Sequence, residues 1–148
     1  MKICPMTEAD CKKTELLMKE CFSVPWSLEG LKEMFHTEGY CSFLAKEGEE
    51  VIGYVGMKMV LDEADITNVA VKPSHRKKGI AGKLLAQLLE EAKEQELCSI
   101  YLEVRASNIA AITLYEHAGF KEIGQRKNYY DHPQENARLM QWEAERYQ

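Results

Sequence analysis

The chain has 148 residues, 45% of them hydrophobic, which suffices for one compact domain with a buried core but not for two. The formal net charge is −5, so bulk charge argues against direct binding to nucleic acid. The N-terminus lacks the apolar run of a signal peptide, and no apolar stretch is long enough to cross a membrane. We therefore expect a cytoplasmic protein without a membrane partner.

The N-terminal third is expected to form a short strand and two helices. Residues 2–4 are a candidate strand, and residues 7–10 resemble a capping box that begins a helix ending near Phe22. Ser27 can cap a second helix, which is expected to end near Gly39. Three strands should follow as an antiparallel meander, over residues 40–46, 51–60 and 65–71.

The segment after this meander combines basic residues, glycines and a helix start. A turn leads to Gly79, where apolar residues begin to recur on one helical face. The first amides of a helix lack intrahelical acceptors and bind phosphate readily, and Gly79 and Gly82 leave the backbone open to an anion. The positive charge around it comes from Arg76, Lys77, Lys78 and Lys83. A solvated basic turn is the alternative.

Counting residues excludes two nucleotide-binding motifs in this loop. A Walker loop would need glycine at Lys77 and serine or threonine at Leu84. A dinucleotide-binding loop would need a third glycine, at Lys77 or at Ala81. The loop therefore matches neither of these motifs.

The long helix that begins at Gly79 is expected to connect two parallel strands of the sheet in a right-handed crossover. Residues 98–104 alternate as a strand, and residues 108–118 form a helix with Gly119 as its C-terminal cap. A final pair of strands, 120–127 and 137–142, is joined by a loop that contains residues 128–133. The expected fold is mixed α/β (α+β): one sheet, antiparallel first and parallel in the middle, with flanking helices.

The cysteines and histidines do not indicate a metal or redox centre. No C-x-x-C pair occurs, and the four histidines lie at no ligand-like spacing. We expect no metal, and free thiols at Cys4, Cys11, Cys21, Cys41 and Cys98.

The sequence Arg76-x-x-Gly79-x-Ala81 resembles the Gln/Arg-x-x-Gly-x-Gly/Ala signature of the GCN5-related N-acetyltransferase (GNAT) family. Further runs narrow the resemblance to the RimI branch, the ribosomal-protein-alanine N-terminal acetyltransferases, and extend it over nearly the whole chain. These runs are residues 25–27, 68–71, 102–108, 114–120 and 126–130. The resemblance implies a single N-acetyltransferase domain over residues 1–148, with a GNAT-like fold whose central parallel strands splay apart to admit acetyl-CoA.

The resemblance also implies how acetyl-CoA is bound. Backbone groups of residues 69–71 would pair with the pantetheine like an added strand, amides from Lys77 to Gly82 would hold the pyrophosphate, and Asn108 would bond the pantetheine. The expected cofactor-binding residues are Val69, Ala70, Val71, Arg76, Lys77, Lys78, Gly79, Ile80, Ala81, Gly82, Lys83, Asn108 and Tyr115.

Acetyl transfer to an amine needs an acceptor for the amine's proton and a donor for the departing thiolate. Glu103 lies near the C-terminal end of a central strand, where α/β sheets bind ligands, and is the candidate base. Tyr115 follows Asn108 by about two helical turns and is the candidate acid. The alternatives are a surface glutamate paired with Arg105 or a lysine, and a packed helix tyrosine.

The expected acceptor is the α-amine of a protein, a small-subunit ribosomal protein that begins with alanine. Candidate substrate-binding residues are Trp26, Asn68, Arg105, Tyr129 and Tyr130, with Trp26 alternatively packed beneath its loop. A lysine side chain, a polyamine or an aminoglycoside is a second acceptor class, and an acyl-CoA sensor without activity is a third reading. We expect a monomer or a weak dimer.

Overall fold

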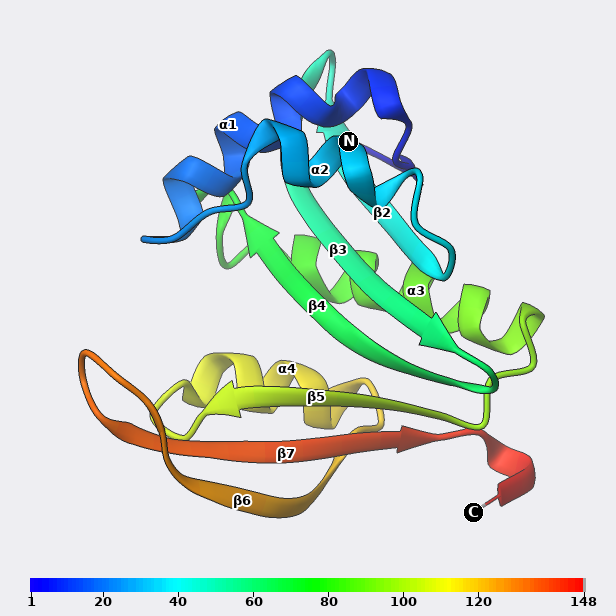
Figure 1. The fold of residues 1–148 in the computed structure, drawn as a ribbon, viewed down its shortest axis with the longest axis vertical. Helices are drawn as coiled ribbons and strands as arrows, with labels where there is room; N and C mark the ends of the chain where they lie inside the picture. Colours follow the sequence, from blue (N-terminus) through cyan, green and yellow to red (C-terminus); the bar gives the residue numbers. More distant parts are fainter. Residues whose placement is uncertain (148) are drawn as a thin grey trace.

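The computed structural model describes residues 1–147, whose strands form one mixed sheet (Figure 1). The strands are β1 (Lys2–Pro5), β2 (Tyr40–Glu47), β3 (Glu50–Val60), β4 (Glu63–Val71), β5 (Ser99–Arg105), β6 (Lys121–Tyr130) and β7 (Glu135–Glu143). They lie in the order β1-β2-β3-β4-β5-β7-β6, and the β4–β5 pair is parallel whereas the other neighbours run antiparallel. The expected mixed sheet is confirmed.

Two pairs of helices cover the two faces of this sheet. They are α1 (Cys11–Cys21), α2 (Leu28–Met34), α3 (Ile80–Glu94) and α4 (Ile109–His117), with short 3-10 turns η1 (Glu8–Asp10), η2 (Pro73–His75) and η3 (Glu145–Tyr147). Helices α1 and α2 lie in front of the sheet in Figure 1, and α3 and α4 lie behind it. Each face has its own buried cluster, with Met18 and Leu31 in front and Leu84 and Leu88 behind. Among residues 1–147 no helix has the length and apolarity to span a bilayer.

The predicted capping box forms and ties the first helical turn to the sheet. The backbone N of Thr7 donates to Asp10 Oδ2 at 2.8 Å, and Lys46 Nζ lies 2.7 Å from Asp10 Oδ1. Burial opposes the ionisation of Asp10, but hydrogen bonds from Lys46 and Thr7 prevail and hold the pKa of this carboxyl below its usual value. The chain therefore enters α1 through η1, and the polar box is anchored to β2.

Strands β4 and β5 part soon after they meet. Their register covers only Glu63–Asp65 opposite Ser99–Tyr101, although β4 continues to Val71 and β5 to Arg105. Beyond that point β4 carries an irregularity at Thr67, where its pairing with β3 shifts by one residue. The predicted splay of the central parallel pair is thereby confirmed, and it opens toward the C-terminal ends of both strands (Figure 1).

Two predicted boundaries are wrong. Helix α2 ends at Met34, well before Gly39, because the chain turns there and Gly39, with φ of 96°, leads into β2. Strand β6 continues to Tyr130, so residues 128–130 lie in a strand and not in the connecting loop. A bulge between Arg126 and Tyr130 admits Asn128 with φ of 51°, and this polar interruption disguises the strand in the sequence.

The absence of a side chain at Gly56 makes room for a buried phenol on the next strand position of the same face. Tyr54 is 1% exposed, and its hydroxyl lies 3.1 Å from Ser42 Oγ. A Cβ added at Gly56 would overlap this hydroxyl and would lie 3.0 Å from Thr67 Oγ1, at the irregularity in β4. Gly56 is thus required by close packing.

Gly56→Ala is expected to destabilise the protein by about 1–3 kcal/mol, because overpacking displaces Tyr54 or the β4 bulge. Gly124→Ala is the matched control, since its Cβ would meet only Leu139 Cδ1, at 3.8 Å. Chemical denaturation of both variants measures the difference. Equal free energies of unfolding for the two variants would contradict the packing role of Gly56.

Candidate active site

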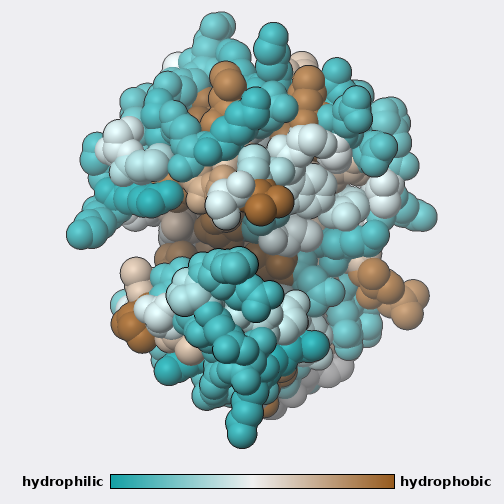
Figure 2. Space-filling view, turned by 60° about the vertical axis from the view of Figure 1, so that its left-hand side comes forward, coloured by the Kyte–Doolittle hydropathy of each residue, from teal (hydrophilic) through white to brown (hydrophobic). Residues whose placement is uncertain are grey.

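A groove crosses the molecule where β4 and β5 part. Figure 2 shows it between an upper and a lower half, with an apolar floor. Two cavities open along it. The helix-lined cavity, about 580 Å³, is bounded by the end of α1, β4, the basic loop and the first turns of α3 and α4. The strand-lined cavity, about 600 Å³, is bounded by β4, β5, β6 and β7. Both volumes are typical of small-molecule sites.

The helix-lined cavity collects most of the predicted cofactor-binding residues. Those that line it are Val69, Ala70, Val71, Arg76, Lys77, Gly79, Ile80, Ala81, Gly82 and Asn108. The sequence analysis missed Cys21, Phe22, His75, Ala110, Ala111 and Leu114, which also line it. The residues from α1 could not be identified because their proximity to the loop depends on tertiary packing. Lys78, Lys83 and Tyr115 are not among the lining residues.

The start of α3 is shaped as an anion cradle. Lys77 and Gly79 have φ of 65° and 79°, so the loop takes two left-handed steps before the helix. A Cβ built at Gly79 meets nothing within 4 Å, and one at Gly82 meets only Leu114 Cδ1, at 3.8 Å. Unpaired amides at the positive end of α3 therefore face open space, which suits a pyrophosphate.

The exposed backbone of β4 offers a short edge to a ligand. Lys72 N donates to Ile52 O of the β3 side, so ladder alternation directs the backbone of Ala70 to β3 and those of Val69 and Val71 toward the gap. The Val71 carbonyl already accepts from Arg76 Nε at 3.0 Å. Val69 and the amide of Val71 remain for an added strand, whereas Ala70 can contribute only its side chain.

Asn108 serves first as the cap of α4. Its Oδ1 accepts from the backbone N of Ala111 at 3.2 Å, which leaves the Nδ2 amide to donate to a ligand in the helix-lined cavity. A pantetheine carbonyl is a suitable acceptor for this amide.

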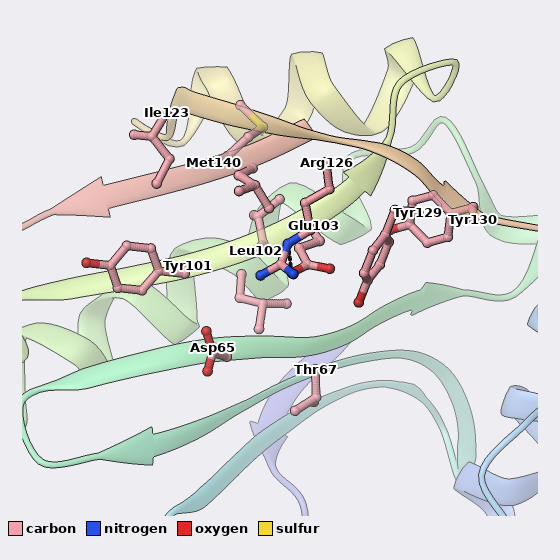
Figure 3. Close-up of a pocket in the computed structure, with 12 residues that line it drawn as sticks. Asp65, Thr67, Tyr101, Leu102, Glu103, Ile123, Arg126, Tyr129, Tyr130 and Met140 are labelled. Carbon is pink, nitrogen blue, oxygen red and sulfur yellow. Dashed lines mark ion pairs between the residues drawn. The ribbon is translucent and has the colours of Figure 1, made fainter. Parts of the chain in front are cut away.

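Glu103 lies at the centre of the strand-lined cavity (Figure 3). Its neighbours Leu102 and Val104 are buried against α3 and α4, so strand alternation turns Glu103 to the opposite face. Glu103 Oε1 lies 3.3 Å from Arg126 Nε, and a hydrogen bond with Glu103 raises the pKa of Tyr129. Glu103 therefore pairs with Arg126, and the alternative of a pair with Arg105 or a lysine is wrong.

The strand-lined cavity also contains Tyr129 and Tyr130, two of the candidate substrate-binding residues. Tyr129 and Tyr130 lie with ring centroids 5.1 Å apart, and burial is the main cause that raises the pKa of Tyr130. The residues that sequence reasoning missed are Asp65, Ile66, Thr67, Tyr101, Leu102, Ile123, Arg126, Leu139 and Met140. Asp65 adds a second carboxylate to this cavity.

Tyr115 lies on α4, behind β5, and lines neither cavity. It is 8% exposed and packs against Phe120 with ring centroids 5.8 Å apart. Burial, with a smaller contribution from Tyr130, raises the pKa of Tyr115 to about 12. Its hydroxyl therefore keeps its proton at neutral pH and can act only as a donor to an anion.

Trp26 and Asn68 are joined to each other and lie outside both cavities. Trp26 Nε1 donates to Asn68 Oδ1 at 2.7 Å, and its ring meets Tyr40 edge-on at 6.4 Å. The hydrogen bond ties the loop between α1 and α2 to β4. Packing is thus the observed role of Trp26.

Arg105 uses its guanidinium within the chain. It donates to the carbonyls of Asp131 and Pro133 at 3.0 Å each, contacts Glu135 Oε2 at 3.1 Å, and stacks on the ring of Tyr130 at 4.4 Å. These contacts hold the β6–β7 connection in place beneath Tyr130. The geometry favours this supporting role over direct contact with a substrate.

The described cysteines are free thiols, and residues 1–147 contain no cluster of histidine, cysteine and acidic side chains suited to a metal ion. The strand-lined cavity brings together carboxylates, phenols and the guanidinium group of Arg126. The carboxylates can accept a proton from an amine and bind its charged form.

Comparisons with known proteins agree with this geometry. A sequence profile of the acetyltransferase (GNAT) family matches residues 12–120. The [ribosomal protein bS18]-alanine N-acetyltransferase of Haemophilus influenzae is 37% identical over 95% of this chain and 97% of its own. The Escherichia coli enzyme of the same name is 39% identical over 72% of this chain and 71% of its own.

Solved structures of N-acetyltransferases are also similar to this chain. The crystal structure of the ribosomal-protein-S18-alanine N-acetyltransferase from Escherichia coli matches with a TM-score of 0.88 and 31% identity, over 96% of this chain and 92% of that one. The PaiA N-acetyltransferase from Thermoplasma acidophilum, solved in complex with coenzyme A, shares the fold with a TM-score of 0.79 and 17% identity, over 97% of this chain and 100% of that one. The chain thus belongs to the acetyltransferase (GNAT) family and is an acetyl-CoA-dependent N-acetyltransferase.

Proposed function

We propose that this enzyme acetylates the N-terminal α-amine of a protein, and that its acceptor is a ribosomal protein bS18 that begins with alanine. The observation that carries the proposal is the placement of Glu103 in a cavity beside the β4–β5 gap, across from the phosphate cradle of α3. The alignments of this chain with relatives named for bS18 cover up to 97% of the relatives' length, which supports the same acceptor here.

The helix-lined cavity fits acetyl-CoA, which supplies an activated acetyl thioester. Amides from Lys77 to Gly82 would hold its pyrophosphate, because the cradle at Gly79 is open and Arg76 is fixed beside it by Val71. Val69 and the Val71 amide would pair with the pantetheine, and one such amide would bind the oxyanion. The Nδ2 of Asn108 would donate to the pantetheine.

Glu103 would accept the proton of the attacking amine, directly or through water. It is 31% exposed in the strand-lined cavity, so an acceptor can reach it from the open end of the groove. Tyr115 would donate a hydrogen bond to the departing sulfur, since its high pKa keeps the hydroxyl protonated. The two groups come from opposite sides of β5 and would meet at the gap.

We also propose the extent of the catalytic domain, its location in the cell and the path by which the acceptor enters. One catalytic domain would span residues 1–148, since all seven strands of the described residues belong to one sheet. A cytoplasmic site of action is part of the proposal, because ribosomal proteins are synthesised there. The acceptor polypeptide would enter the strand-lined cavity beside Tyr129 and Tyr130.

A peptide panel tests the acceptor. Peptides that begin with free alanine, serine, glycine or methionine, each paired with an N-blocked version that contains lysine, are incubated with enzyme and acetyl-CoA. Mass spectrometry is expected to find acetyl on the free alanine terminus. Acetylation of lysine alone, or of a polyamine in its place, would overturn the proposed acceptor, and Asp65 would then be the group to examine first.

Glu103→Gln is expected to lower kcat for the alanine peptide by about 10²–10⁴-fold, because the amide cannot accept the proton. Affinity for acetyl-CoA, measured by calorimetry, should change little, since Glu103 does not line the helix-lined cavity. Glu116→Gln, on the exposed side of α4, is the matched control and should keep full activity. A fully active Glu103→Gln enzyme would refute the role of Glu103.

Tyr115→Phe is expected to reduce turnover by about 10-fold or more, because the leaving sulfur loses its hydrogen-bond donor. The dissociation constant of acetyl-CoA should change little, since Tyr115 does not line the helix-lined cavity. Steady-state kinetics and direct binding separate the two effects. Unchanged turnover would remove Tyr115 from the mechanism.

A further inference from the structure

We infer that Arg126 is a positioning residue for catalysis: it holds the Glu103 carboxylate in the orientation from which the carboxylate takes the amine proton. The inference rests on the proposed role of Glu103 and assigns a function to a side chain outside the Arg-x-x-Gly-x-Ala signature. Arg126 would act on the reaction only through Glu103.

The contacts of Arg126 all point into the strand-lined cavity. Its Nε lies 3.3 Å from Glu103 Oε1, and its guanidinium carbon lies 5.5 Å from the centroid of the Tyr129 ring (Figure 3). Tyr129 lines the same cavity, and the neighbouring Glu103 carboxylate raises the pKa of its phenol. Glu103 therefore has two side chains of one strand beside it, and Arg126 forms the ion pair with it.

This arrangement depends on the bulge in β6. Arg126 and Tyr129 are three positions apart, so regular alternation would turn them to opposite faces of the sheet. The pairing with β7 moves from Ala137 to Glu135 while β6 advances from Arg126 to Tyr130, which adds two residues to β6. The extra residues turn both side chains toward Glu103. A surface ion pair alone would not require a bulge in the strand, and bulges often orient side chains at active sites.

Exposure separates a catalytic effect of Arg126 from a structural one. The Arg126 side chain is 57% exposed, and ion pairs at such sites contribute little to stability. Its removal should therefore leave the fold intact. A glutamate side chain without its partner samples several rotamers, however, and misplacement by an ångström can cost up to about 10²-fold in rate.

The test is a double-mutant cycle on the full-length enzyme with the alanine peptide. Arg126→Met is expected to lower kcat by about 10-fold with the KM for acetyl-CoA unchanged, and Arg126→Lys should recover part of the loss. In a Glu103→Gln background, Arg126→Met should have no further effect, because the group it positions is gone. Lys127→Met removes the same charge from the next residue of β6 and is the control, expected to be fully active.

The outcomes separate this inference from the proposed function. Loss of activity in Glu103→Gln together with full activity in Arg126→Met would overturn the inference alone. An equal loss in Arg126→Met and Lys127→Met, or an undiminished effect of Arg126→Met in the Glu103→Gln background, would also overturn it. Full activity of Glu103→Gln would overturn the proposed base and the inference with it.

Discussion

The parting of β4 and β5 is the constraint on which the rest of the molecule depends. The two strands pair over three residues and then leave main-chain groups of Val69 and Val71 without a strand partner. Unpaired backbone groups are costly unless a ligand, water or a side chain satisfies them. Arg76 satisfies one, the Val71 carbonyl, and the others face the cavity in which a pantetheine arm would complete the sheet.

The helices on the far side of the sheet follow from the same geometry. Helix α3 follows β4 after η2 and the basic loop, and α4 follows β5 after a short turn, so the N-termini of both helices lie beside the helix-lined cavity. Amide groups and Asn108 therefore converge where the strands diverge, and Glu103 lies on the other side of the sheet. The proposed site of the acetyl donor and the proposed site of the acceptor thus lie on the two sides of the β4–β5 gap.

Much of this was predictable where the physics is local. The start of α3 at Gly79 and the capping box at Thr7 follow from backbone and side-chain chemistry within a few residues. The mixed sheet followed from the order of the predicted strands and helices, the splay followed from the resemblance, and Glu103 was located on its strand. Residues that lie together only through tertiary packing were not predictable: Phe22 against the basic loop, Arg126 beside Glu103, and Arg105 on the β6–β7 connection.

In the edge strand β6, the orientation of Arg126 and Tyr129 is linked to how readily the edge of the sheet can pair with another strand. Strand β6 has β7 on one side only, and a free strand margin invites another chain to add to it. Its pairing is interrupted twice, and lysines stand at residues 121 and 127. The bulge that turns Arg126 and Tyr129 inward also disrupts the regular backbone edge with which another strand would pair. Straightening this strand to gain stability would therefore expose a regular edge to other chains and would also change the orientation of Arg126 and Tyr129.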